Sequence, residues 1–187
     1  MGKLLKDFLY ILEYVHGSIT ENKVGYKSGL SGAPEKFTYV RRFIMKIAVI
    51  NGPNLNLLGR REPEIYGSGT LEELQKMLIE ASEGKNVEFK FFQSNSEGEI
   101  VDFIHQCIGS VDGIIINPGA YSHYSIAILD ALRAFDGKIV EVHISNVFKR
   151  EEIRHSLITA RAADAVIAGM GFEGYVFAFF YLLSLSE

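Results

Sequence analysis

Short apolar runs alternate with helical patterns along the chain from Met45 onward. Mostly apolar runs predict strands at 46–50, 113–117, 138–144 and 164–169, and an alternating run predicts a strand at 86–92. Apolar residues at helical spacing predict helices at 70–84, 96–109, 125–135, 150–157 and 173–187. Strands that alternate with helices in this way indicate a parallel sheet covered by helices on both faces.

The fold class that follows is a three-layer α/β fold with a doubly wound sheet. Crossovers between parallel strands are right-handed, and a chain of this size suits five parallel strands in the flavodoxin-like order 2-1-3-4-5. Ligands of such sheets bind beyond the carboxyl ends of the strands. We therefore expect the loops after the first, third and fourth strands to meet in one crevice.

Two of the helices begin with a capping-box sequence, in which an N-cap hydroxyl and a glutamate three residues later bond each other's backbone amides. Thr70 pairs with Glu73 in the first helix, and Ser96 pairs with Glu99 in the second. The helix at 173–187 is densely apolar but too short to cross a bilayer, so we expect it to pack on the sheet.

Residues 1–44 have a different pattern from the rest of the chain. The stretch "LLKDFLYILEYVHG" predicts an amphipathic helix, and the Gly, Ser, Lys and Pro residues of "NKVGYKSGLSGAPEK" predict a linker. We expect an N-terminal extension at 1–44 and one compact domain at 45–187. An over-called start, an added arm and an oligomer contact all fit the extension, and the sequence does not choose among them.

Composition narrows the class of protein. A net charge of −4 without a block of Lys or Arg gives no reason to expect nucleic acid or a membrane as partner. The single cysteine, Cys107, cannot form an internal disulfide, which favours a reducing cytoplasm. Cys107 also lies in an apolar helical pattern, so we interpret it as a core residue.

Polar side chains gather after three of the predicted strands. The connection "NGPNLNLLGRREPEIYGSGT" after the first strand is far longer than the roughly 2–6 residues that such a link needs, which is typical of a binding loop or lid. Folding alone does not require amides, imidazoles and guanidinium groups at one edge. The candidate residues are Asn54, Arg61, Tyr66, Asn117, His123, Asp130, His143, Ser145 and Arg154.

Familiar cofactor motifs are missing from these loops. No G-x-G-x-x-G follows the first strand and no G-x-x-x-x-G-K-[ST] occurs in the chain, so a bound nucleotide has little support. His123 and His143 lack the accompanying carboxylates or thiolates of a metal site, and one cysteine is too few for a structural zinc. We expect neither a cofactor nor a metal.

The remaining residues suit a small anion and proton transfer. Arg61 and Arg154 can bind a carboxylate through their planar forks. A free tyrosine has a pKa near ~10, but a nearby cation favours the tyrosinate, and Arg61 precedes Tyr66 in the same loop. Tyr66 is therefore a candidate general base.

His143 is the candidate for the matching acid. Glu141 stands two residues earlier on the same strand, hence on the same face, and can fix the tautomer of the imidazole. The backbone amides of Ile144 and Ser145 can hold an anion. Taken singly, each residue also has a structural explanation: a surface aromatic for Tyr66 or a surface ion pair for Arg154. The residues alone thus indicate a small-molecule site with acid/base capability.

Four long blocks resemble the type II 3-dehydroquinate dehydratases. They are "NGPNLNLLGRREPEIYGSGTLEEL", "FQSNSEGEIVDFIH", "INPGAYSHYSIAILDAL" and "EVHISNVFKREEIRH", and they come in the order of that family, followed by "GMGFEGY". The resemblance runs from Met45 almost to the C-terminus. It implies a flavodoxin-like fold, a homododecamer built from trimers, and loss of water from 3-dehydroquinate to give 3-dehydroshikimate without metal or organic cofactor.

The resemblance also implies roles for single residues. Tyr66 matches the base that removes a proton alpha to the ketone and forms an enolate, Arg61 its activator, and His143 the acid that protonates the departing hydroxyl. Asn54 matches the asparagine that organises the enolate. Substrate contacts carry over to the side chains of Asn117, His123, Asp130 and Arg154 and to the backbone amides of Ile144 and Ser145.

Three other interpretations remain. A silent relative that binds a cyclic hydroxy acid as a sensor would keep the fold without turnover, and a flavin or nucleotide binder would be coloured or bind phosphate. A Schiff-base enzyme for the same reaction needs a catalytic lysine, and Lys149 alone lies in the three matched loops. The family serves aromatic amino-acid biosynthesis most often, which favours that role over quinate breakdown.

Overall fold

The computed structural model describes residues 44–60 and 69–185 of the 187-residue chain. The expected helix and linker of the N-terminal extension lie outside these residues. Within the described part, no helix is both long and apolar enough to cross a membrane.

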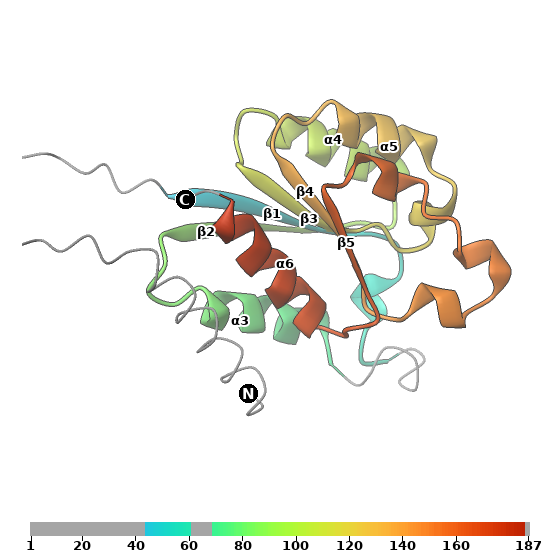
Figure 1. Ribbon diagram of the computed structural model, residues 1–187, viewed down its shortest axis with the longest axis horizontal. Coiled ribbons are helices and arrows are strands. Elements are labelled where there is room, and N and C mark those ends of the chain that lie inside the picture. Colours follow the sequence, from blue (N-terminus) through green and yellow to red (C-terminus); the bar gives the residue numbers. More distant parts are fainter. Residues whose placement is uncertain (1–43, 61–68, 186–187) are drawn as a thin grey trace, which may run out of the picture. The chain divides into compact units, whose positions relative to one another are not determined.

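Five parallel strands form one sheet in the order β2-β1-β3-β4-β5, which confirms the expected topology (Figure 1). Each of the five predicted runs is a strand, and no boundary differs from expectation by more than one residue. The strands are β1 (Met45–Asn51), β2 (Val87–Gln93), β3 (Gly113–Asn117), β4 (Lys138–His143) and β5 (Ala165–Ala168).

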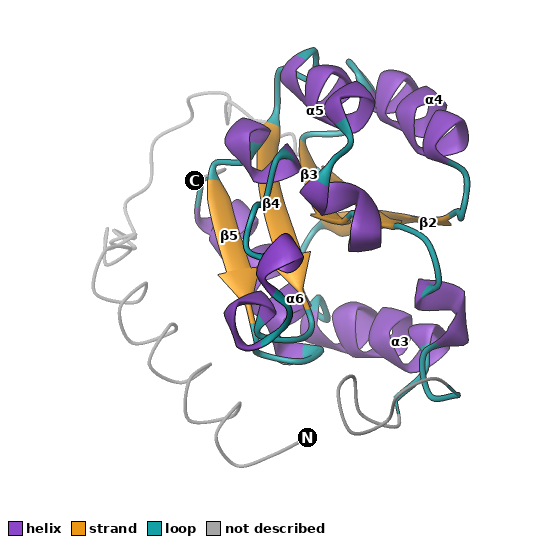
Figure 2. Ribbon diagram, turned by 90° about the vertical axis from the view of Figure 1, so that its right-hand side faces the viewer, coloured by secondary structure: helices purple, strands orange, loops and turns teal. Residues whose placement is uncertain are grey.

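Two helices cover each face of the sheet. Figures 1 and 2 show α4 (Glu97–Cys107) and α5 (Ile126–Arg133) on one side, and α3 (Leu71–Ala81) and α6 (Glu173–Ser184) on the other. The inner strands β1, β3 and β4 are almost entirely buried, which explains why their sequences are mostly apolar. The edge strands β2 and β5 have only half-buried and exposed residues.

Successive residues of each strand point to opposite layers. Ala48, Ile50, Ile114 and Ile116 belong to the core cluster that includes residues of α4 and α5. Residues of the other parity face α6, since the Cβ position of Gly113 lies 3.1 Å from Leu182. The two layers therefore receive different residues from the ends of the same strands.

The two predicted capping boxes have different outcomes. At α3, Thr70 and Glu73 make both reciprocal bonds. At α4, the Ser96 hydroxyl accepts from the Glu99 amide, but the Glu99 carboxylate accepts from the Ser94 hydroxyl instead of the Ser96 amide. The Ser96 amide donates to Ser94 Oγ at 2.9 Å, so a neighbouring hydroxyl takes the place of the second half of the box.

The predicted helix at 150–157 is wrong. Two 3₁₀ turns, η3 (Val147–Lys149) and η4 (Glu152–Arg154), stand in this region. Arg150 between them has extended backbone angles, and the amide of Ile158 donates to the carbonyl of Ser122 at 2.7 Å. An isolated helix of two turns is marginal, and bonds to the loop after β3 decide the path of this segment instead.

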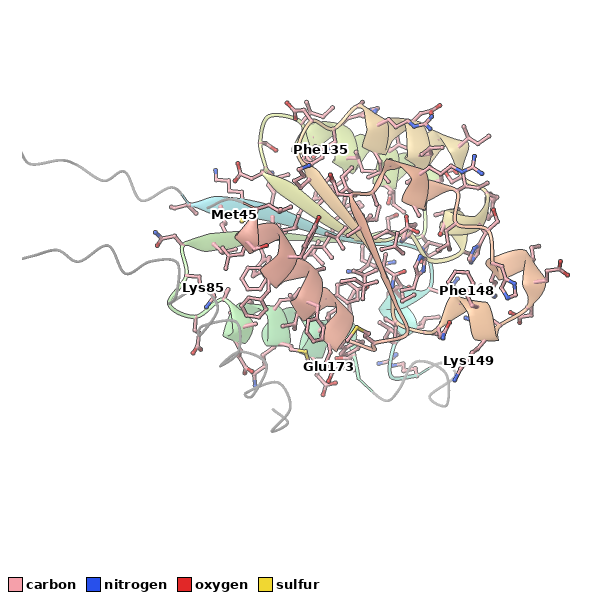
Figure 3. All side chains as sticks on the ribbon, in the orientation of Figure 1. Met45, Lys85, Phe135, Phe148, Lys149 and Glu173 are labelled. Carbon is pink, nitrogen blue, oxygen red and sulfur yellow. The ribbon has the colours of Figure 1, made fainter. Side chains whose placement is uncertain are left out.

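The strands bring three loops to one edge of the sheet. Asn51 at the end of β1 is in register with Asn117 at the end of β3, and Ile116 is in register with Glu141 of β4. Figure 3 shows Met45 at one end of the strands and Phe148 with Lys149 at the opposite end. The loops after β1, β3 and β4 continue as η1 (Leu55–Leu57), η2 (Gly119–His123) and η3, all at the carboxyl edge.

Candidate active site

A cleft opens where the three loops meet, as expected from the topology. It is walled by apolar side chains from the first and third of these loops and by amides, imidazoles and guanidinium groups from all three. Its lining consists of Pro53, Asn54, Leu55, Leu57, Leu58, Asn117, Gly119, Ala120, His123, His143, Ile144, Ser145, Val147, Arg150 and Arg154. Nine of the eleven predicted site residues lie in the described part of the chain. Seven of these nine line the cleft, and the other two are Glu141 and Asp130.

His143 is bonded to a buried carboxylate at the end of β4. Its Nε2 lies 2.8 Å from Oε1 of Glu141, and the side chains of His143 and Glu141 are 6% and 0% exposed. The predicted juxtaposition of the two residues is therefore present. Alternation along β4 places both on the face covered by α4 and α5, together with Ile139.

Two hydroxyl groups complete the surroundings of Glu141. Ser122 Oγ of η2 donates to Oε1 at 2.9 Å, and Thr159 Oγ1 donates to Oε2 at 2.6 Å. A buried carboxylate is costly unless hydrogen bonds satisfy its oxygens, and bonds to an ionised group contribute about 1.5–3 kcal/mol each. Three donors on two oxygens match the acceptor-only pattern of an ionised carboxylate.

This arrangement orients the His143 ring. Because a carboxylate only accepts, Nε2 of His143 carries a proton, and Nδ1 is left as the ring nitrogen that can exchange one. Glu141 also places a carboxylate directly beside the ring. The pair can therefore act as a proton donor with a fixed direction.

His123 lies across the cleft with a different environment. Its Nδ1 is 3.0 Å from the carbonyl of Ser156, so Nδ1 donates and Nε2 is available to a ligand. Burial is the main cause that lowers the pKa of His123, while the bond to Ser156 acts in the opposite direction; the charges of Arg154 and His143 lower it further. The neutral form of His123 is thus favoured.

Two arginines of the third loop share one carboxylate. Nε of Arg154 lies 2.9 Å from Oε2 of Glu151, and Nε of Arg150 lies 3.7 Å from the same oxygen. Arg154 therefore makes an ion pair, which was its structural explanation from the sequence, and it also lines the cleft. Only Nε of Arg154 is used in this pair, so its terminal amino groups can still serve an anionic ligand.

Asn54 stands in a left-handed backbone conformation, with φ of 66°, which asparagine tolerates better than most residues. The backbone N–H of Asn54 donates to Oδ1 of Asn95 at 2.8 Å, and Nε2 of Gln93 donates to the same oxygen at 3.2 Å. Asn95 follows β2, so a neighbouring strand end holds the loop in this shape.

Asp130 is placed away from the cleft, and two further predicted residues cannot be placed. Asp130 is on α5 with a side chain 66% exposed, lies 3.7 Å from Arg133 and is not part of the cleft lining. Arg61 and Tyr66 lie outside the described residues. The preceding loop residues Leu57 and Leu58 do line the cleft.

Sequence reasoning missed Ser122, Thr159, Asn95 and Tyr175. Ser122 and Tyr175 stand inside blocks that carry the family resemblance, yet a hydroxyl in such a block has no pattern of its own. Their partners lie 19 and 124 residues away, at Glu141 and Asn51. Such contacts become visible only when the strand ends are brought together.

No group of three or more His, Cys, Asp or Glu side chains among the described residues is placed to hold a metal ion. The cleft offers hydrogen-bond donors, two cations and imidazoles. This set suits an anionic organic molecule and proton transfer.

Comparison with known families gives a consistent result. The family model described as "Dehydroquinase class II" matches residues 45–183. A 3-dehydroquinate dehydratase of Aliarcobacter butzleri is 60% identical over 131 residues, which cover 70% of this chain and 80% of that relative. A 3-dehydroquinate dehydratase of Carboxydothermus hydrogenoformans is 56% identical over 131 residues, or 70% of this chain and 85% of the relative.

A solved structure also matches. The type II dehydroquinase of Butyrivibrio crossotus is 50% identical, with a TM-score of 0.73, over 74% of this chain and 97% of that structure.

The low pKa of His123 predicts a pH dependence of stability. The unfolded chain takes up the proton near the ordinary value of about 6.5, whereas the folded chain resists it. The contribution of the neutral ring is therefore present above that value and is lost as the pH falls through the folded pKa. We expect His123→Gln to reduce the fall in melting temperature between about pH 7 and pH 5.

The exposed His105 of α4 offers a matched control, since His105→Gln removes an imidazole outside the cleft. A His123→Gln variant whose melting temperature falls as steeply as that of the wild type would contradict this interpretation.

Proposed function

This chain belongs to the class II dehydroquinase family of hydro-lyases, and we propose that it catalyses the reversible dehydration of 3-dehydroquinate to 3-dehydroshikimate. The observation that carries the proposal is the His143–Glu141 pair, fixed in a cleft that also holds His123 and Arg154. The proposed role is a step of the shikimate pathway in aromatic amino-acid biosynthesis, in the cytoplasm.

The first step is removal of a proton from the carbon alpha to the ketone. Tyr66 as tyrosinate takes this proton, and the electron pair of the C–H bond passes to the carbonyl oxygen to give an enolate. Arg61 in the same loop stabilises the tyrosinate by its charge. Asn54 at the rim of the cleft is suited to organise the enolate oxygen, directly or through water.

The second step expels the hydroxyl group. The enolate electrons re-form the ketone and the conjugated double bond, the C–O bond breaks, and His143 gives its proton to the leaving oxygen, which departs as water. Because Nε2 of His143 is bonded to Glu141, the proton given up is the one on Nδ1. Glu141 holds the ring in place before and after the transfer. Side chains supply every proton transfer of this route.

The substrate carboxylate fits the end of the cleft formed by the third loop. In the proposal it accepts hydrogen bonds from the amides of Ile144 and Ser145 and from Arg154. Asn117 at the end of β3 and His123 in the following loop bind the hydroxyl groups of the substrate. All five of these residues line the cleft.

The long loop after β1 acts as a lid in this proposal. Leu57 and Leu58 form part of the cleft wall, and the chain continues from Arg60 toward Tyr66. Closure over the substrate would bring Tyr66 to the carbon acid and exclude water, which strengthens the interaction of Arg61 with the tyrosinate.

Asp130 contacts the substrate of another subunit in this proposal. Within its own chain the side chain is exposed on α5 and pairs with Arg133. A carboxylate outside its own cleft can reach a substrate only from a neighbouring copy, as in the homododecamer built from trimers that the family resemblance implies.

We expect Tyr66→Phe to lower turnover by at least about 100-fold, because the loss of a general base removes that much rate. A substrate analogue should still bind, since the contacts after β3 and β4 are intact. The measurement is the rise in ultraviolet absorbance of the conjugated enone-carboxylate after 3-dehydroquinate is added to chelator-treated protein.

Tyr181→Phe serves as the control, because this exposed tyrosine of α6 lies outside the cleft lining. Retained turnover in Tyr66→Phe would contradict the proposed base. Borohydride added with substrate distinguishes the Schiff-base route, which it would trap as a covalent adduct on a lysine.

Subunit complementation tests the role of Asp130. Tyr66→Phe and Asp130→Asn chains are each expected to be impaired, but a mixed assembly contains sites with Tyr66 from one chain and Asp130 from its neighbour. Random reassembly gives such a complete pair in about one site in four. We therefore expect dissociation and reassembly of the mixed variants to restore roughly that share of wild-type turnover.

Activity in the mixture equal to the sum of the separate variants would show that Asp130 does not act across an interface. Reassembly of each variant alone controls for gain of activity from the treatment itself.

A further inference from the structure

A buried phenol links the ends of β1 and β3 beneath the cleft. Tyr175 belongs to the first turn of α6, and its hydroxyl donates to Oδ1 of Asn51 at 2.7 Å and accepts from Nδ2 of Asn117 at 3.0 Å. The exposed fractions of Tyr175, Asn51 and Asn117 are 0%, 2% and 4%. No step of the proposed reaction uses Tyr175 or Asn51.

The backbone amide of Gly119 determines the direction of the hydrogen bonds that connect Asn117, Tyr175 and Asn51. The N–H group of Gly119 can only donate, and it lies 3.1 Å from one end of the Asn117 amide, which is therefore the oxygen. The other end, Nδ2, then donates to the phenol oxygen of Tyr175. The phenol must in turn direct its own hydrogen to Asn51.

The phenol keeps its proton throughout the working range of pH. Burial raises the pKa of Tyr175 well above its usual value, and the bond from Asn117 opposes this shift only in part. The hydrogen that is donated to Asn51 is consequently always present. If the side-chain amide of Asn117 turned over, its Nδ2 would face the Gly119 amide, donor against donor, and its Oδ1 would face a phenol oxygen whose hydrogen is directed to Asn51. One orientation of the amide is therefore favoured.

We propose that Tyr175 is a positioning residue that holds the amide of Asn117 in one orientation for the substrate. This inference rests on the proposed function, in which Asn117 contacts a substrate hydroxyl. With its inner bonds satisfied by Tyr175 and Gly119, Asn117 can offer the cleft only its second N–H hydrogen or its second oxygen lone pair. An amide that is oriented before binding loses little freedom when the ligand arrives.

The same link secures the start of the loop after β1. Gly52 donates its amide to the Asn117 carbonyl at 2.8 Å, and a Cβ at Gly52 would lie 2.3 Å from the carbonyl oxygen of Pro118. The two loops thus approach each other too closely for a side chain. Tyr175 supports this contact from below by binding the residue that precedes Gly52.

The test is steady-state turnover of 3-dehydroquinate by the full-length Tyr175→Phe variant. We expect KM to rise about tenfold, the effect of losing roughly one well-placed hydrogen bond, while kcat stays within about threefold. Tyr181→Phe on the same helix is the matched control and should leave KM unchanged, because its ring is exposed and outside the cleft lining.

A double-mutant cycle separates positioning from general packing. Asn117→Ala alone should raise KM, and adding Tyr175→Phe to it should raise KM no further if Tyr175 acts through Asn117. Independent, multiplicative increases in KM would overturn the inference. If Tyr175→Phe does not fold, Asn51→Ala tests the other end of the link by removing the phenol's acceptor, and an unchanged KM there would overturn the inference as well.

Failure of this inference is distinguishable from failure of the proposed function. A folded wild-type chain without turnover would overturn both. An active wild type whose KM is unchanged in a folded Tyr175→Phe variant would overturn only the role of Tyr175.

Discussion

The carboxylate of Glu141 is the group around which the cleft is arranged. It lies at the end of a central strand without exposure to solvent, and its oxygens accept from Ser122, Thr159 and His143. These donors come from the loop after β3, from η5 (Thr159–Ala162) and from β4 itself. A buried charge of this kind contributes little to stability compared with an apolar side chain, so its value lies in the direction that it gives to the His143 ring.

Strand alternation divides the support of the cleft between the two faces of the sheet. Glu141 and His143 point toward the layer of α4 and α5, whereas Asn51 and Asn117 bind Tyr175 in the opposite layer. Each layer thus supplies hydroxyl groups to polar residues at the carboxyl edge. Residues that touch a ligand are few in such a site, and the buried partners behind them determine the orientation of those few.

The sequence predicted the sheet well because its inner strands are buried on both faces, and apolar runs as short as "GIIIN" are typical of strands. It also placed seven described candidates around one cleft, since the carboxyl ends of neighbouring parallel strands must meet. The segment at 150–157 was wrong because contacts with the loop after β3 outweigh a weak local preference. Ser122, Thr159 and Tyr175 could not be predicted, because their roles depend on partners distant in the chain.

The most direct test of this account is the kcat of Glu141→Gln with 3-dehydroquinate. The amide keeps the size of the side chain, but it replaces one carboxylate oxygen by an NH2 group. That group sets a donor against the donors that orient the His143 ring and its neighbours. The account predicts a folded, assembled variant with kcat lowered by about 100-fold or more and KM within about threefold, the signature of lost acid catalysis. A folded variant with kcat within about threefold of the wild type would contradict it.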